Sequence, residues 1–142
     1  MRKRVFGRHF SRAQKSRRAL FRTLIGALVK YSKITTTYAR AKAISAQVDK
    51  LVSSAKQNSV SARRKVFAYL GNDKETTNVL FAKVAKTFKD RNSGFTRIIL
   101  LGNRKGDNAP MVRMEWVEQI AEPKANDKTS NDKNLSTKKR RS

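Results

Sequence analysis

The sequence lacks most of the residue types on which catalytic and metal sites depend. There is no cysteine, which excludes disulfides, thiolate metal ligands and a thiol nucleophile. The single histidine, His9, lies close to the N-terminus, so a multi-histidine metal site and a histidine-based triad are excluded. The 10 acidic residues do not pair at the spacing of metal ligands, and no glycine-rich phosphate loop occurs. We therefore expect no enzyme activity, no metal, no cofactor and no small-molecule substrate.

Long apolar runs are also absent. No stretch approaches the roughly 18–20 apolar residues of a membrane-spanning helix, so we expect no membrane contact. Hydrophobic residues form 38% of the chain and are concentrated between Ala19 and Ala121. A length of 142 residues suits one domain with extensions at both ends.

Acidic residues are missing from the first third of the chain. None occurs before Asp49, whereas Lys and Arg occur thirteen times in the first 48 residues. The whole chain has 34 Lys and Arg against 10 Asp and Glu, which gives a net charge of +24. Such a segment repels itself in water unless a polyanion supplies the counter-charge, and nucleic acid is the commonest one. Charge alone therefore predicts a protein that binds nucleic acid.

The apolar pattern predicts an α+β fold, with about four helices packed on a small sheet of roughly three strands. A period near 3.6 predicts helices over about 12–31, 38–56, 60–70 and 74–89. Strands are predicted over 95–101 and 111–118, as an antiparallel pair, and 33–37 is a strand or an extended link. We divide the chain into a basic N-terminal arm (1–12), a single domain (13–122) and a basic tail (123–142). The tail should be disordered, because Leu135 is its only large apolar residue.

Local signals predict how several elements begin, end and pack. Ser11 with Gln14 resembles a capping box before the first helix, and Asp73 can cap the fourth. Gly71 is placed to end the third helix. The strand 95–101 is apolar on both faces toward its end, so we expect it to be covered on both sides. The residues expected to face the core are Leu20, Phe21, Leu24, Ile25, Ala27, Leu28, Ala41, Ile44, Val48, Leu51, Val52, Ala55, Leu80, Phe81, Val84, Phe88 and Trp116.

Basic and aromatic residues alternate in the arm and continue onto the first helix. Arginine can grip a phosphate through two parallel hydrogen bonds and can stack on bases. Phe6, His9 and Phe10 could stack on unpaired bases. A basic tail without defined contacts is the alternative, but the continuation of charge onto a helix face favours an ordered arm. Gly26, near the middle of that face, indicates either a close approach of RNA or a helix–helix contact or simple tolerance.

Three further basic clusters can each be interpreted in two ways. The run 63–65 opens the third helix and either meets phosphate or forms a solvated face. Arg104 and Lys105 lie in the loop between the last two strands, where they contact phosphate or belong to an ordinary turn. Residues 107–108 can brace that turn through hydrogen bonds to the main chain. The run 138–141 resembles a nuclear signal or a polyanion-binding tail, and we interpret it as an electrostatic tether.

Four segments resemble, in order and spacing, the bacterial-type large-subunit ribosomal protein seventeen family over roughly residues 1–119. They are Met1–Arg4 with Arg12 and Arg18 after it, ITTTYARAK (34–42), GFTRI (94–98) and GDNAPM (106–111). The second and the fourth are the most specific. The family more often has histidine where Lys3 stands, so the charge is kept while an imidazole-specific contact is not. The tail beyond Pro123 has no counterpart.

The resemblance implies a structural role in the large ribosomal subunit, on cytoplasmic ribosomes, with binding to large-subunit ribosomal RNA near the outer end of the nascent-chain tunnel. It implies neighbouring large-subunit ribosomal proteins as partners, and it marks 35–42 as an RNA-contacting segment. An architectural DNA-binding protein is the alternative; a basic enzyme acting on RNA lacks a plausible acid–base set. The residues expected to contact RNA are Arg2, Lys3, Arg4, Arg8, His9, Arg12, Lys15, Arg18, Arg22, Lys33, Thr35, Thr36, Arg40, Lys42, Arg63, Arg64, Arg97, Arg104 and Lys105.

Overall fold

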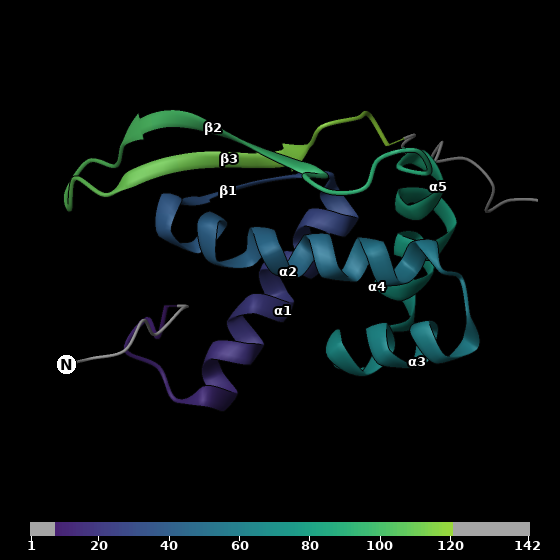
Figure 1. Cartoon of the computed structure of the whole chain (residues 1–142). Coiled ribbons are helices and arrows are strands. Elements are labelled where there is room, and N and C mark those ends of the chain that lie inside the picture. The colour runs from purple at the N-terminus through teal and green to yellow at the C-terminus, as the bar shows by residue number, and fades with distance from the viewer. Residues whose placement is uncertain (1–7, 121–142) are drawn as a thin grey trace, which may run out of the picture.

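The computed structural model describes residues 8–120 and confirms the α+β fold expected from the sequence (Figure 1). The π-helical turn η1 (Leu80–Val84) joins α4 (Lys74–Val79) to α5 (Ala85–Thr87), so these three form the fourth helix predicted over 74–89. Residues 1–7 of the predicted arm and the whole predicted tail lie outside the described residues. The elements are α1 (Gln14–Tyr31), β1 (Lys33–Thr37), α2 (Tyr38–Lys56), α3 (Val60–Tyr69), α4 (Lys74–Val79), η1 (Leu80–Val84), α5 (Ala85–Thr87), β2 (Thr96–Asn103) and β3 (Pro110–Trp116).

The three strands form one antiparallel sheet in the order β1-β3-β2, so the first strand of the chain pairs with the last. β2 and β3 form the predicted hairpin, with a bulge between Leu100 and Gly102. The helices lie on one side of the sheet, and α2 runs between the sheet and the N-terminal half of α1 (Figure 1). Because side chains alternate along a strand, Met114 faces the helices whereas Arg113 and Glu115 face outward.

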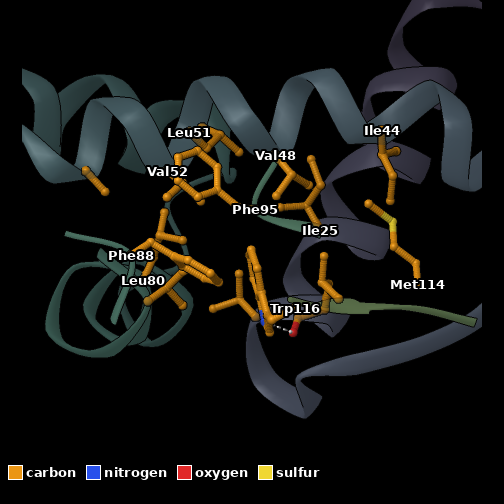
Figure 2. Close-up of a cluster of buried hydrophobic side chains, with 14 of the residues drawn as sticks. Ile25, Ile44, Val48, Leu51, Val52, Leu80, Phe88, Phe95, Met114 and Trp116 are labelled. Atoms are coloured by element: carbon orange, nitrogen blue, oxygen red, sulfur yellow. Dashed lines mark hydrogen bonds between the residues drawn. The ribbon is translucent and has the colours of Figure 1, made fainter. Parts of the chain in front are cut away.

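The core lies between the sheet and the helices, and most of its predicted members are buried (Figure 2). All six residues of the predicted α2 stripe are buried, which confirms the helical period of that segment. In α1 the buried positions are Phe21, Ile25, Leu28 and Val29, while Leu20 and Leu24 are half-buried. The predicted core position of Trp116 is confirmed, and its ring centroid lies 5.8 Å from that of Phe88.

Two of the three predicted helix signals are confirmed and one is wrong. Asp73 caps α4, since its Oδ1 accepts a 3.1 Å hydrogen bond from the Thr76 main-chain N–H. Gly71 follows α3 with φ +75°, a left-handed conformation that suits glycine. The capping box at Ser11 does not form. α1 begins at Gln14, its N-cap is Ala13 without a side-chain hydrogen bond, and Ser11 has φ +49° in a turn upstream.

The expectation that strand 95–101 is covered on both faces is also wrong. The observed strand β2 starts at Thr96 and extends to Asn103. Leu100 is 71% exposed and Leu101 is 49% exposed. The reason is geometric, because β2 is an edge strand of the sheet and the outer end of the hairpin projects beyond the helices of the described part of the chain (Figure 1).

Candidate nucleic-acid interface

Residues 8–12 fold back on the first turns of α1, and Arg17 of α1 fastens them there. Arg12 donates a 3.1 Å hydrogen bond to the carbonyl oxygen of Phe10. Arg17 donates to Nδ1 of His9 at 3.0 Å and to the carbonyl oxygen of Arg12 at 3.4 Å. Because Arg17 can only donate, His9 accepts through an unprotonated Nδ1. The end of the arm therefore lies in a defined position beside the basic face of α1.

Phe10 has a different role from the one expected. Its ring meets that of Phe21 edge-on, with the centroids 6.1 Å apart, and it packs half-buried against the core. This contact anchors the end of the arm on α1 and removes Phe10 from the side chains that present a free face to RNA. Phe6 lies outside the described residues. Arg8, His9 and Arg12 remain exposed on the arm, as do Lys15, Arg18 and Arg22 along α1.

A hollow of about 390 Å³ opens where α1, α2 and α3 meet. Nε of Arg22 donates a 2.8 Å hydrogen bond to the carbonyl oxygen of Tyr69, at the C-terminus of α3. The hydroxyl of Tyr69 in turn donates to Oε1 of Gln47 on α2. Burial raises the pKa of Tyr69, against the opposing effect of Arg22 and Arg18. Sequence reasoning missed Gln47 and Tyr69, since neither carries charge or belongs to a motif. The hollow is lined by Gln14, Arg17, Arg18, Phe21, Arg22, Gln47 and Tyr69.

In the segment 35–42, strand β1 turns the neighbouring residues Thr35 and Thr36 toward opposite faces of the sheet. Thr35 is exposed on the outer face of the sheet, whereas Thr36 is 5% exposed and pairs with Val112 on the inner face. The structure therefore places Thr36 in the core and not on the surface. Arg40 is half-buried and Lys42 is exposed, both in the first turns of α2.

The outer face of the sheet collects basic side chains around one carboxylate. Lys33, Glu115 and Arg97 stand opposite one another across the three strands. Nη2 of Arg97 lies 2.6 Å from Oε1 of Glu115, and Nε of Arg113 lies 3.2 Å from Oε2. Lys33, Arg97 and Arg113 outnumber Glu115 and the nearby Glu118, so this face keeps a net positive charge. The outward position of Arg113 was readable from strand alternation, although it was not among the residues expected to contact RNA.

The run 63–65 contains two arginines with different surroundings. The guanidinium carbon of Arg63 lies 4.8 Å from the centroid of the Phe81 ring, and Arg63 donates a 3.1 Å hydrogen bond to Asn78. These contacts tie α3 to the α4 and η1 segment. Arg64 is exposed and, with Lys74, lines a separate hollow of about 320 Å³. Of the two, Arg64 is the better placed to contact phosphate.

The hairpin loop is braced as expected. Arg104 grips Asp107 through two hydrogen bonds of 3.0 and 2.6 Å, and Asp107 also accepts from the Ala109 main-chain N–H at 3.3 Å. The hydrogen bond from Arg104 is the main cause that lowers the pKa of Asp107 to about 2. Asn108 accepts from the side chain of Asn103 at 2.8 Å, not from the main chain. The charge of Arg104 is therefore balanced locally, whereas Lys105 is exposed without an acidic partner among the described residues.

Gly26 does not lie in the exposed basic face of α1. A Cβ atom at this position would point toward α4 and lie 4.0 Å from Oγ1 of Thr76, an ordinary van der Waals distance. The structure therefore favours the helix–helix interpretation over a close approach of RNA.

The predicted contacts thus fall into separate surfaces. Arg8, His9, Arg12, Lys15, Arg18 and Arg22 share the surface around α1. Lys33, Thr35 and Arg97 share the outer face of the sheet, on the opposite side of α2 (Figure 1). Arg64 and Lys105 lie apart from both. Arg2, Lys3 and Arg4 lie outside the described residues. Within residues 8–120, acidic and histidine side chains form no group that could hold a metal ion. In the same part of the chain, no helix is long and apolar enough to cross a membrane.

Comparison with known proteins agrees with the resemblance seen in the motifs. The family model described as ribosomal protein L17 matches residues 20–117. The chain is 42% identical over 128 residues to the large ribosomal subunit protein bL17 of Thermodesulfovibrio yellowstonii, covering 90% of this chain and 96% of that protein. It is 39% identical over 133 residues to the protein of that name from Syntrophotalea carbinolica, covering 94% and 84%. The match to the protein from Desulforudis audaxviator is 46% identical over 101 residues, covering 71% and 89%. Because these matches span most of both chains, the protein belongs to the ribosomal protein L17 family.

Proposed function

We propose that this chain is a structural constituent of the large ribosomal subunit, which binds large-subunit ribosomal RNA near the outer end of the nascent-chain tunnel and stabilises its fold. Family membership supports a structural role in the ribosome, and the name of the relatives supports the large subunit. Neighbouring large-subunit proteins are its other partners, on cytoplasmic ribosomes. Its role is to hold RNA in place, not to catalyse a reaction.

The basic surface around α1 carries this proposal. No Asp or Glu occurs before Asp49, so this segment contains no negative side chain that could neutralise its Lys and Arg charges. Among the described residues, ion pairs to α1 occur only at Lys30, which lies 2.9 Å from Glu75 and 3.5 Å from Asp73. Elsewhere on the helix, Arg18 and Arg22 are exposed to solvent. A phosphate backbone is the partner that such a surface fits best.

The two basic surfaces suggest how the protein acts on RNA. One surrounds α1 and the end of the arm, and the other is the outer face of the sheet, with α2 between them (Figure 1). In our proposal the folded domain docks through these surfaces, while residues 1–12 insert among RNA segments. Arginine forks and threonine hydroxyls would contact phosphate and sugar, which fixes orientation without reading bases.

Co-sedimentation with large ribosomal subunits after a high-salt wash tests the proposal. The wild-type chain should stay with the subunits. Arg18→Glu should be released into the supernatant, because it reverses a charge on the α1 surface. Lys86→Glu makes the same change at an exposed position outside both basic surfaces and should stay bound. Release of the wild-type chain, or equal behaviour of the two variants, would contradict the proposal. Duplex DNA of equal length should compete poorly with ribosomal RNA, which separates this role from architectural DNA binding.

A further inference from the structure

We propose that the hollow between α1, α2 and α3 binds one unpaired nucleotide of RNA, with its phosphate on the arginines of α1 and its base on the ring of Tyr69. This inference rests on the proposed function and specifies what the surface around α1 recognises. The volume of about 390 Å³ lies within the roughly 300–1,000 Å³ that is usual for small-ligand sites. None of the described residues that line it is acidic.

The phosphate side of the hollow is held in place before any ligand arrives. Arg22 is fixed by its 2.8 Å hydrogen bond to the Tyr69 carbonyl oxygen, and its side chain passes over Gly71, where a Cβ would lie 3.4 Å from Nη1. Arg17 is fixed by His9 and by the Arg12 carbonyl oxygen. Each guanidinium has five N–H donors, so both retain donors for a phosphate. Groups that are already ordered lose less conformational freedom on binding, which favours affinity.

The base side is equally constrained. The hydroxyl of Tyr69 is bonded to Oε1 of Gln47, which holds the ring between α3 and α2. Tyr69 is 38% exposed, so part of its ring remains accessible to a base. Since Oε1 of Gln47 is occupied, the amide NH₂ of Gln47 remains to donate to an acceptor on a base edge. The phenol of Tyr69 is neutral near pH 7, as for an ordinary tyrosine, and burial raises its pKa further, so it adds no negative charge that would repel phosphate.

A hollow of this size discriminates between paired and unpaired RNA. A base inside a duplex is stacked on both faces and cannot reach the Tyr69 ring unless it leaves the stack. Proteins recognise RNA most often through bulges and loops, where unstacked bases lie against aromatic side chains. The site should therefore bind a nucleotide in a bulge or a loop and should contribute nothing to the binding of a continuous duplex.

Two RNA hairpins of equal length test the inference, one fully paired and one with a single-nucleotide bulge. The full chain should bind the bulged hairpin more tightly. Tyr69→Ala should weaken binding of the bulged hairpin about fivefold or more, which is the low end of what stacking of one base on an aromatic ring contributes. Binding of the paired hairpin should not change. Tyr31→Ala removes a ring that is 72% exposed at the other end of α1, and it should leave both affinities unchanged.

Two further variants keep the test decisive if Tyr69→Ala fails to fold. Gln47→Ala releases the Tyr69 hydroxyl without disturbing the bond from Arg22 to the main chain, and it should weaken only the bulged hairpin. Tyr69→Phe keeps the ring and should retain most of the preference. If Gln47→Ala weakens both hairpins equally or weakens neither, or if Tyr69→Phe loses the preference for the bulged hairpin, the inference is wrong while the proposed function stands. If the wild-type chain binds neither hairpin nor ribosomal RNA, the proposed function itself fails.

Discussion

The indole nitrogen of Trp116, on β3, donates a buried 3.2 Å hydrogen bond to the main-chain carbonyl oxygen of Leu28, in the last turn of α1 (dashed line in Figure 2). Carbonyl groups at the end of a helix run short of main-chain donors, so this bond supplies a partner where one is needed. It also joins the end of the basic helix to the central strand of the sheet.

Trp116→Phe should therefore destabilise the fold without changing the RNA-binding surfaces. The loss should be about 1–3 kcal/mol for the carbonyl left without this donor, plus a smaller contribution from the cavity that phenylalanine leaves. Urea unfolding measures the loss. The folded variant should bind ribosomal RNA like the wild type. A stability equal to that of the wild type would show that the bond does not hold α1 to the sheet.

Asp73 provides a prediction about acid stability. Its hydrogen bonds from Thr76 and the nearby charge of Lys30 hold the pKa of Asp73 below its usual 3.8. A carboxyl whose pKa is lower in the folded state stabilises the fold above the unfolded pKa, and this contribution is lost as the pH falls through the folded pKa. Asp73→Ala should cost about 1 kcal/mol at neutral pH, as for other lost N-caps.

Melting temperatures recorded from pH 7 downward check this prediction. The difference between the wild type and Asp73→Ala should be constant near neutrality and should shrink below about pH 4, where the wild type loses the contribution of the carboxylate. A difference that does not depend on pH would contradict the assignment. Glu75→Ala is the control, since Glu75 is an exposed partner of Lys30 that does not cap the helix.

The neighbouring residues Arg63 and Arg64 should respond in opposite ways to substitution. Arg63→Ala removes the contacts to Phe81 and Asn78 and should lower stability by about 0.5–1 kcal/mol, with little effect on RNA binding. Arg64→Ala should leave the melting temperature unchanged and reduce the salt slope of RNA binding by about one, as expected for one lost phosphate contact. Thermal melts and a salt titration of each variant measure both effects. The reverse result would contradict the assignment of the two side chains.

Gly26→Ala should stabilise the protein. The new Cβ would lie at an ordinary contact distance from Thr76, and alanine is about 1 kcal/mol more favourable than glycine inside a helix. Unfolding should therefore shift to a higher urea concentration, and affinity for ribosomal RNA should stay the same. A loss of affinity without a loss of stability would instead show that RNA approaches the main chain here.

Periodicity predicted the parts of the fold that are governed by local burial. The α2 stripe is buried as expected, because a helix that lies across a sheet must turn one continuous face inward. Capping by Asp73 and termination at Gly71 were readable for the same reason, since each depends on a few neighbouring residues. The capping prediction at Ser11 failed because contacts with Arg17 and Phe21 determine the conformation of residues 8–12. Local sequence propensity carries no information about such contacts.

The site required tertiary information. Arg18 and Arg22 were expected from charge, but Gln47 and Tyr69 join them only because three helices cross at one place. Thr36 was expected on the surface from its motif, and the pairing of β1 with β3 turns it inward. Leu100 is exposed on the edge strand β2 although its cross-strand partner Val112 is buried, and the position of a strand at the edge of a sheet cannot be read from an apolar pattern.

The most direct test of the account is the salt dependence of affinity between the purified chain and large-subunit ribosomal RNA. If about 6–10 phosphates are neutralised, affinity should fall by roughly 10³–10⁵ between 50 and 200 mM salt. A tight complex at low salt with this steep dependence would support RNA as the partner that balances the basic surfaces. No binding at low salt, or an affinity that does not change with salt, would contradict it.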